Sequence, residues 1–131
     1  MRETILVVDD EDDIRLVVRR MLEAKGYVVL DARDPHHALR IAGREPIDLL
    51  LTDVIMPLMR GTELAQRVRA LVPAAKVLLM SAYKIAEITE SQLPFIAKPF
   101  TPEALTDKVG QLLRPSSSPF TRRPPARPGQ P

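Results

Sequence analysis

The chain has 131 residues, a length that favours one domain. Hydrophobic residues make up 45% of it and charged residues 27%, as in an ordinary soluble globular protein. The sequence has no cysteine, which excludes disulfides, thiolate metal ligands and cysteine nucleophiles. Aromatic residues are only 4%, so a base-stacking surface for single-stranded nucleic acid is not expected. No apolar run approaches the roughly 20 residues that span a membrane, and no secretory signal is found, so a cytoplasmic location is expected.

The net positive charge of the protein comes from the end of the chain. Residues 115–131 carry Arg122, Arg123 and Arg127 and no acidic residue. Of the 19 basic residues, 16 therefore lie in residues 1–114 beside all 17 acidic residues, giving that part a net charge of −1. Six of the 17 residues in 115–131 are proline, which removes backbone donors and blocks helices. We expect a domain over 1–114 that does not bind DNA, followed by a disordered Pro/Arg-rich tail.

The first half of the chain alternates between short apolar strands and amphipathic helices. Residues 5–8 form a continuous apolar run typical of a strand buried on both faces. The next apolar residues recur at helical spacing, which predicts one helix face made by Ile14, Val17, Val18, Met21 and Leu22. Gly26 is expected to end that helix, and a second strand to cover 27–30. Asp34-Pro35 then supplies an N-cap followed by proline, for a helix to about Ala42.

The second half continues the same alternation. Strands are expected over 47–52, 76–80 and 95–97. Helices are expected over 62–71, over roughly 84–90, and from a start at Thr101-Pro102. The apolar positions of the first and last of these helices are Leu64, Val68, Leu71, Leu105, Val109, Leu112 and Leu113. Five strand–helix units favour an α/β fold with a doubly wound, five-stranded parallel sheet covered by helices on both faces.

Chemically active side chains follow four of the predicted strands. Asp9 and Asp10 come after the first strand, Asp53 after the third, Ser81 after the fourth and Lys98 after the fifth. In open α/β sheets, sites form at the carboxyl ends of the strands, near the switch in strand order. Clustered carboxylates repel one another, and oxygen ligands without His or Cys suit Mg²⁺ or Mn²⁺. A lysine among them offers a fixed positive charge for a phosphoryl group.

Each of these residues also has an ordinary structural explanation when taken alone. Asp9 and Asp10 can cap the first helix, Asp53 can form a turn, and the hydroxyl of Ser81 can cap a helix. A lone lysine is normally solvated, although an X-Pro bond such as that after Lys98 can be cis in a tight turn. The conjunction at four separate strand ends favours a functional site.

The chain resembles a bacterial response-regulator receiver domain of two-component systems over about residues 3–114. The resemblance is carried, in order, by Ile5-Leu6-Val7-Val8-Asp9-Asp10-Glu11, by residues 48–57, by Gly61-Thr62-Glu63-Leu64, by Met80-Ser81-Ala82 and by Lys98-Pro99-Phe100. Residues 98–105 are especially similar to receivers of hybrid sensor histidine kinases, and single-domain response regulators are similar as well. The resemblance implies a flavodoxin-like (βα)5 receiver fold.

The resemblance also implies a role for each residue of the site. Asp53 would be the phospho-acceptor, which becomes an aspartyl phosphate by attack on a phosphohistidine of a partner kinase. Asp10 would bind Mg²⁺ directly, with Asp9 helping through water, and Asp53 and the backbone carbonyl of Ile55 would be further metal ligands. Lys98 would bind a phosphoryl oxygen and offset charge in the transition state.

A two-state switch follows from the same resemblance. Ser81 would donate a hydrogen bond to the phosphoryl group, and Phe95, at the family's aromatic switch position, would fill the space that is vacated. The surface around the fourth and fifth strands would then change for a partner. Lys98 follows Ser81 by only 17 positions, several fewer than the family usually has, which predicts a shortened fourth helix.

The leading hypothesis is a phosphorelay signalling module rather than a turnover enzyme on an external substrate. Its expected partners are a sensor histidine kinase or histidine phosphotransfer protein, an unknown downstream protein and a second copy in a homodimer. We expect no membrane partner, no DNA partner and no DNA-binding output domain. One alternative is a pseudo-receiver scaffold that does not turn over phosphate. The intact site residues argue against it and the short fourth helix favours it; those site residues are Asp9, Asp10, Asp53, Ser81 and Lys98. Another is a Mg²⁺-dependent phosphatase or phosphotransferase, which would need a cap or a second acid beside its nucleophile; Val54 and Ile55, which follow Asp53, offer none.

Overall fold

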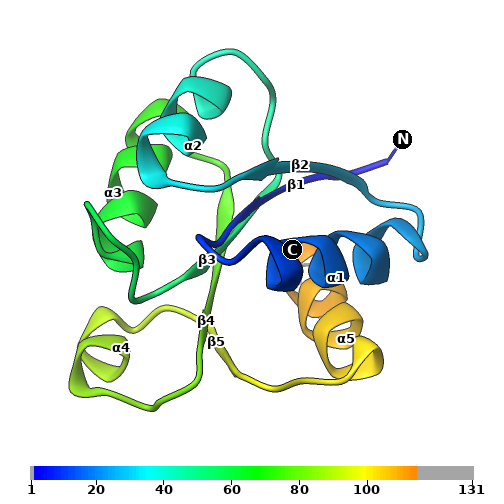
Figure 1. The fold of residues 1–131 in the computed structure, drawn as a ribbon. Helices are drawn as coiled ribbons and strands as arrows, with labels where there is room; N and C mark the ends of the chain where they lie inside the picture. Colours follow the sequence, from blue (N-terminus) through cyan, green and yellow to red (C-terminus); the bar gives the residue numbers. More distant parts are fainter. Residues whose placement is uncertain (1, 115–131) are drawn as a thin grey trace, which may run out of the picture.

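The computed structural model describes residues 2–114, in which five strands alternate strictly with five helices (Figure 1). In chain order they are β1 (Thr4–Val8), α1 (Asp12–Glu23), β2 (Val28–Ala32), α2 (Pro35–Ala42), β3 (Leu49–Asp53), α3 (Gly61–Leu71), β4 (Lys76–Ser81), α4 (Ala86–Ser91), β5 (Phe95–Ala97) and α5 (Pro102–Leu113). The tail expected over 115–131 lies outside the described residues.

All five strands pair in parallel, in the order β2-β1-β3-β4-β5. This confirms the predicted doubly wound (βα)5 sheet. The strand order reverses beside β1, since β2 lies on one side of it and β3 on the other. In open α/β sheets the carboxyl ends of the strands at such a reversal flank the binding crevice. The fold therefore places any site next to the ends of β1 and β3.

The sheet is buried on both faces because successive side chains of a strand point to opposite sides. Leu6 and Val8 of β1 belong to a core cluster that includes residues of α2, α3 and α4. Ile5 and Val7 belong to a second cluster, with residues of α1 and α5. The helices lie on the two faces accordingly, with α1 and α5 on one side and α2 and α3 on the other (Figure 1).

Two helices begin where the sequence predicts, at a polar cap followed by proline. The Asp34 carboxylate accepts a hydrogen bond from the backbone N–H of His37 at 2.9 Å. The Thr101 hydroxyl accepts one from the N–H of Ala104 at 3.0 Å. Each bond satisfies one of the donors that the first helical turn leaves without a partner.

Gly26 closes the C-terminus of α1 as predicted. With φ of +91°, it donates its N–H to the Glu23 carbonyl at 2.9 Å, and the N–H of Tyr27 reaches the Leu22 carbonyl at 3.3 Å. Several other predicted boundaries were wrong by a few residues. β3 begins at Leu49 rather than at residue 47. α4 covers 86–91 rather than 84–90 and, with six residues, is the shortest helix in the described part of the chain, which confirms the predicted shortening.

Two apolar side chains at helical spacing lie outside the core. Val17 of α1 is 48% exposed and Leu71, the last residue of α3, is 54% exposed. Val18 and Leu22, four residues apart, are the buried pair of α1. Val17 precedes Val18 by one residue, so its side chain points about 100° around the helix axis from the buried side chains. The apolar face of α1 is thus wider than the strip that the sheet covers.

Gly61 marks a close approach of α3 to the end of β3. Its N–H donates a hydrogen bond to the backbone carbonyl of Val54 at 2.8 Å. A Cβ at this position would collide with the backbone carbonyl oxygen of Asp53. The absence of a side chain at Gly61 therefore allows α3 to begin directly beside the last residue of β3.

We expect Gly61→Ala to lower the free energy of unfolding by about 2 kcal/mol, because the new methyl group meets backbone that cannot move without shifting β3. Gly110→Ala is the matched control, since its Cβ meets nothing closer than the Tyr27 hydroxyl at 3.9 Å. In mid-helix it should stabilise the protein by about 0.5–1 kcal/mol. Urea unfolding of both variants checks this, and an unchanged or raised stability of Gly61→Ala would contradict the packing argument.

Candidate functional site

The carboxyl ends of β1, β3 and β5 bring a lysine between two aspartates. Asp9 follows β1, Asp53 is the last residue of β3 and Lys98 follows β5. The Lys98 ammonium nitrogen lies 3.0 Å from Asp9 Oδ2 and 3.0 Å from Asp53 Oδ2. β4 separates β3 from β5 in the sheet, so the lysine side chain reaches over the end of β4 to make both contacts. The peptide bond after Lys98 is cis, as the sequence suggested.

This ion pair is largely removed from solvent. The side chain of Asp9 is 0% exposed, that of Asp53 13% and that of Lys98 14%. Burial alone would lower the pKa of the Lys98 ammonium, but its hydrogen bonds to Asp53 and Asp9, and their charges, outweigh burial and raise that pKa. Lys98 therefore stays protonated across the physiological pH range and offsets part of the charge of the two carboxylates.

Every polar group of Asp9 has a partner. Its N–H donates to the Ala32 carbonyl at 3.3 Å, and its carboxylate accepts from the Glu11 N–H at 2.9 Å as well as from Lys98. Its backbone carbonyl accepts from Arg15 Nη1 at 2.9 Å. A buried carboxylate needs such partners to offset the loss of its hydration. These bonds hold both the backbone and the side chain of Asp9 in place at the end of β1.

Asp10 completes an acidic cluster with Asp9 and Asp53. The three residues each offer a carboxylate oxygen, and these oxygens all lie within 4.8 Å of one another. Three carboxylates beside one lysine leave a surplus of negative charge, which favours a cation. Ile55 lies in the loop after β3 with its side chain half-exposed. Among residues 2–114 no hydrogen bond to its backbone carbonyl is found, so that oxygen is also free to act as a ligand.

The two remaining predicted residues, Ser81 and Phe95, contact groups other than the acidic cluster. Ser81, at the end of β4, is buried, and its hydroxyl donates to the Tyr83 carbonyl at 2.8 Å and accepts from the Tyr83 N–H at 3.1 Å. Phe95, the first residue of β5, is half-buried and packs against the core cluster that contains Ile88 of α4. The hydroxyl of Ser81 is therefore bonded to the β4–α4 loop rather than to Asp53.

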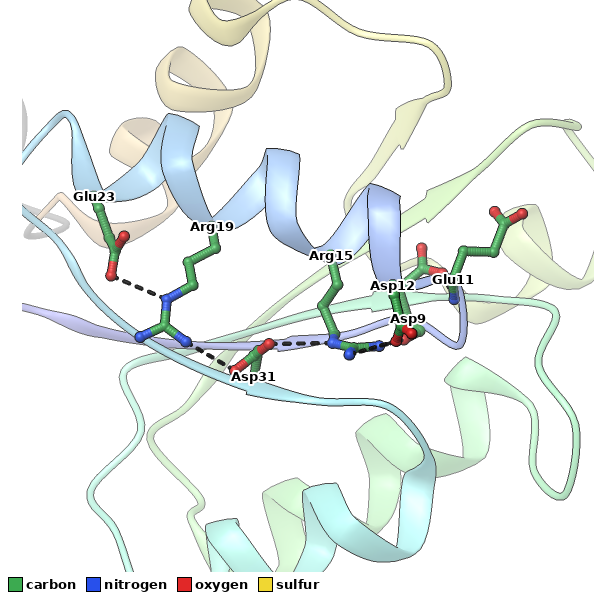
Figure 2. Close-up of polar contacts among 7 residues, drawn as sticks. All are labelled: Asp9, Glu11, Asp12, Arg15, Arg19, Glu23 and Asp31. Atoms are coloured by element: carbon green, nitrogen blue, oxygen red, sulfur yellow. Dashed lines mark hydrogen bonds and ion pairs between the residues drawn. The ribbon is translucent and has the colours of Figure 1, made fainter.

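Sequence reasoning missed Arg15 and Asp31. Arg15 contacts the backbone of Asp9, and Asp31 of β2 in turn contacts Arg15 (Figure 2). The signal in the sequence was a carboxylate directly after the apolar run Val28-Val29-Leu30. A carboxylate in a strand calls for a cation from a neighbouring element, and the basic residues of the following or preceding helix are the candidates.

Comparison with known proteins identifies the family. Residues 5–110 match the family model described as the response regulator receiver domain. The chain therefore belongs to the response regulator receiver domain family, whose members are modules of bacterial two-component phosphorelays. Receiver domains of this family interact with histidine kinases or phosphotransfer proteins and bind Mg²⁺ at an acidic pocket.

Individual relatives agree with this assignment. The chain is 34% identical to sporulation initiation phosphotransferase F of Bacillus subtilis over 118 residues, which cover 86% of this chain and 95% of that protein. The structure superposes on chemotaxis protein CheY4 of Vibrio cholerae with a TM-score of 0.81 and 29% identity, covering 86% and 100% of the two chains. The receiver domain of the hybrid histidine kinase CckA gives a TM-score of 0.75 and 39% identity, covering 85% and 99%.

Several other relatives are longer, and the chain spans about half of their length. Their names describe transcriptional regulators, which is a property of those whole proteins. Among the helices described here, none combines the length and the apolar character that crossing a membrane requires.

Removal of Lys98 from its ion pair should destabilise the fold strongly. Lys98→Met leaves the buried Asp9 carboxylate close to Asp53 without a counter-charge, so we expect the free energy of unfolding to fall by about 3 kcal/mol. Lys76→Met is the control, because Lys76 is exposed at the start of β4, and it should change stability by less than about 0.5 kcal/mol. Urea unfolding at pH 7 with EDTA measures both, and equal losses would show that the ion pair does not stabilise the fold.

Proposed function

We propose that this receiver domain accepts a phosphoryl group on Asp53 from a phosphohistidine of a sensor histidine kinase or phosphotransfer protein, in a Mg²⁺-dependent reaction. The observation that carries the proposal is the Lys98 ammonium, 3.0 Å from a carboxylate oxygen of Asp53 and 3.0 Å from one of Asp9. An ammonium in contact with the acceptor oxygen is close enough to contact a phosphoryl oxygen once Asp53 carries the group. The relative from Bacillus subtilis, named a phosphotransferase, also supports transfer of a phosphoryl group.

The proposed step exchanges one bond to phosphorus for another. A carboxylate oxygen of Asp53 forms a bond to phosphorus while the phosphorus–nitrogen bond of the phosphohistidine breaks. The imidazole leaves as the neutral base after taking a proton from solvent. Asp53 is partly exposed, so a donor has access to it, and Lys98 offsets charge on the oxygens of the group in transit.

The groups that would hold Mg²⁺ are the carboxylates of Asp9, Asp10 and Asp53 and the backbone carbonyl of Ile55. This all-oxygen donor set fits a hard cation that keeps several of its waters, and Mn²⁺ accepts the same donors. Bound there, the ion would neutralise charge on the phosphoryl oxygens. The cluster of three carboxylate oxygens within 4.8 Å is the feature that supports this part of the proposal.

The proposed output is a change of the surface around β4, α4 and β5. Ser81 would release Tyr83 and donate its hydrogen bond to the phosphoryl group, because phosphorylation adds negative charge and strong acceptors at Asp53. The β4–α4 loop then loses both of its bonds to that hydroxyl. Phe95 would move into the vacated space, and its contacts with the cluster around Ile88 would carry the change to α4. A downstream protein that binds this surface reads the phosphorylation state.

We expect acetyl phosphate with Mg²⁺ to add one phosphoryl group to the protein, and Asp53→Asn to abolish the adduct because it removes the nucleophilic oxygen. Intact mass measurement detects the adduct. Asp107→Asn, an exposed aspartate of α5, is the matched control and should be labelled like the unaltered protein. Labelling that survives in Asp53→Asn would refute the assignment of the acceptor. No adduct on the unaltered protein, with Mg²⁺ still bound, would favour a scaffold that does not turn over phosphate.

Mg²⁺ should stabilise the protein through the acidic cluster. At ten times its Kd, Mg²⁺ should add about 1.4 kcal/mol to the free energy of unfolding. Asp10→Asn should remove this response, and in EDTA it should be at least as stable as the unaltered protein because one of three mutually repelling charges is gone. Thermal unfolding with EDTA and with Mg²⁺ measures both effects. A full Mg²⁺ response in Asp10→Asn would mean that the cation binds elsewhere.

A further inference from the structure

Arg15 of α1 connects the acidic cluster to the edge of the sheet. Its guanidinium makes three hydrogen bonds, from Nη1 to the backbone carbonyl of Asp9 at 2.9 Å, from Nη2 to Asp12 Oδ1 at 2.7 Å and from Nε to Asp31 Oδ2 at 3.1 Å. Figure 2 shows the three acceptors around one side chain. Only 15% of that side chain is exposed, and its bonds to Asp9 and Asp31 are partly buried, whereas Asp12 is 83% exposed. A planar guanidinium with all three acceptors in place has little freedom to turn.

Asp31 of β2 anchors this arrangement from the opposite side. Its second carboxylate oxygen accepts a hydrogen bond from Arg19 Nη1 at 2.9 Å, and Arg19 Nε is 3.1 Å from Glu23. The result is a line of alternating charges from Glu23 through Arg19, Asp31 and Arg15 to the end of β1 (Figure 2). Arg19 therefore bonds Asp31, as Arg15 does, but makes no contact with Asp9.

The bond from Arg15 fixes the peptide group that leads into Asp10. The carbonyl of Asp9 and the N–H of Asp10 belong to that one planar unit. Asp10 is exposed, and within residues 2–114 its carboxylate has no hydrogen-bond or ion-pair partner. Its position therefore depends on the backbone that carries it. Arg15 also bonds Asp12, so it closes the short loop from the end of β1 to the first turn of α1.

We propose that Arg15 is a positioning residue for the cation site: by holding the peptide between Asp9 and Asp10, it aims the Asp10 carboxylate at the acidic cluster. The inference rests on the proposed function only in taking Mg²⁺ as the ligand of that cluster. Arg15 touches neither the acceptor carboxylate of Asp53 nor Lys98 in this structure, so its effect reaches the site through the backbone of Asp9.

A positioning role and a purely electrostatic role of Arg15 predict opposite changes in the Kd for Mg²⁺. Arg15 is a cation close to the cluster, and its charge by itself opposes the binding of Mg²⁺. Removing the charge would therefore strengthen Mg²⁺ binding if electrostatics alone mattered. Removing a group that orients a ligand weakens metal binding, typically by about 10–100-fold. The sign of the change in Kd separates the two roles.

The test is Mg²⁺ titration by calorimetry of the unaltered protein and of Arg15→Gln, Arg15→Lys and Arg19→Gln. We expect the Kd for Mg²⁺ to rise about tenfold in Arg15→Gln. Arg15→Lys should also weaken binding, because it keeps the charge but cannot contact Asp9, Asp12 and Asp31 together. Arg19→Gln is the matched control: it removes an equal charge from the same network and should leave the Kd within about twofold.

Tighter binding by Arg15→Gln, or equal Kd values for all four proteins, would overturn the proposal. Urea unfolding of each variant shows whether a weaker Kd merely reflects partial unfolding. Arg15→Lys keeps the test decisive if Arg15→Gln does not fold.

A metal-free readout separates this inference from the proposed function. In ¹⁵N–¹H NMR spectra recorded in EDTA, the amide signals of Asp10 and Glu11 should shift in Arg15→Gln and stay in place in Arg19→Gln. If the unaltered protein binds no Mg²⁺, the proposed function fails, and these amide signals still decide whether Arg15 holds the loop. Unmoved amides in Arg15→Gln would overturn the positioning role whether or not Mg²⁺ binds.

Discussion

The ion pair of Lys98 with two aspartates is the constraint on which the rest of the site depends. Asp9 is buried at the end of β1, and a carboxylate in that position is costly unless a cation or hydrogen-bond donors accompany it. Lys98 supplies that charge from the end of β5, and the same ammonium contacts Asp53. The carboxyl ends of three strands are thereby held together by one side chain. Asp10 still leaves the cluster with excess negative charge, an instability that is commonly retained at sites built for a ligand.

The proposed mechanism needs a fixed part of the site and a part that rearranges. On the β1 side, Asp9 is bonded through its N–H, its carbonyl and both carboxylate oxygens, and Arg15 extends this rigidity to α1 and β2. On the β4 side, Ser81 is bonded to the loop that leads into a six-residue helix. Binding and transfer require fixed ligands, whereas a signal requires a surface with two arrangements. In the proposed mechanism, the end of β1 meets the first requirement and the loop after β4 meets the second.

Much of the fold was predictable because it follows from local patterns. Residues 5–8 are apolar without interruption, and a run of that kind forms a strand buried on both faces. Asp34-Pro35 and Thr101-Pro102 mark helix starts through backbone donors that need a cap. Exact strand ends were less predictable, since β3 begins at Leu49, the residue at which its pairing with β1 and β4 begins. The exposure of Val17 likewise depends on how far the sheet extends under α1, which no local pattern contains.

The sequence by itself determined the alternation of strands and helices and the residue types at each strand end, because hydrophobic period and capping act over a few residues. It thereby indicated that Asp9, Asp10, Asp53, Ser81 and Lys98 share one edge of the sheet. Only the tertiary structure decided which of them touch: Lys98 spans Asp9 and Asp53, while Ser81 bonds Tyr83 instead. It also brought Asp31 to Arg15, 16 positions earlier in the chain. Such contacts depend on the order and register of the strands, which distances along the chain do not specify.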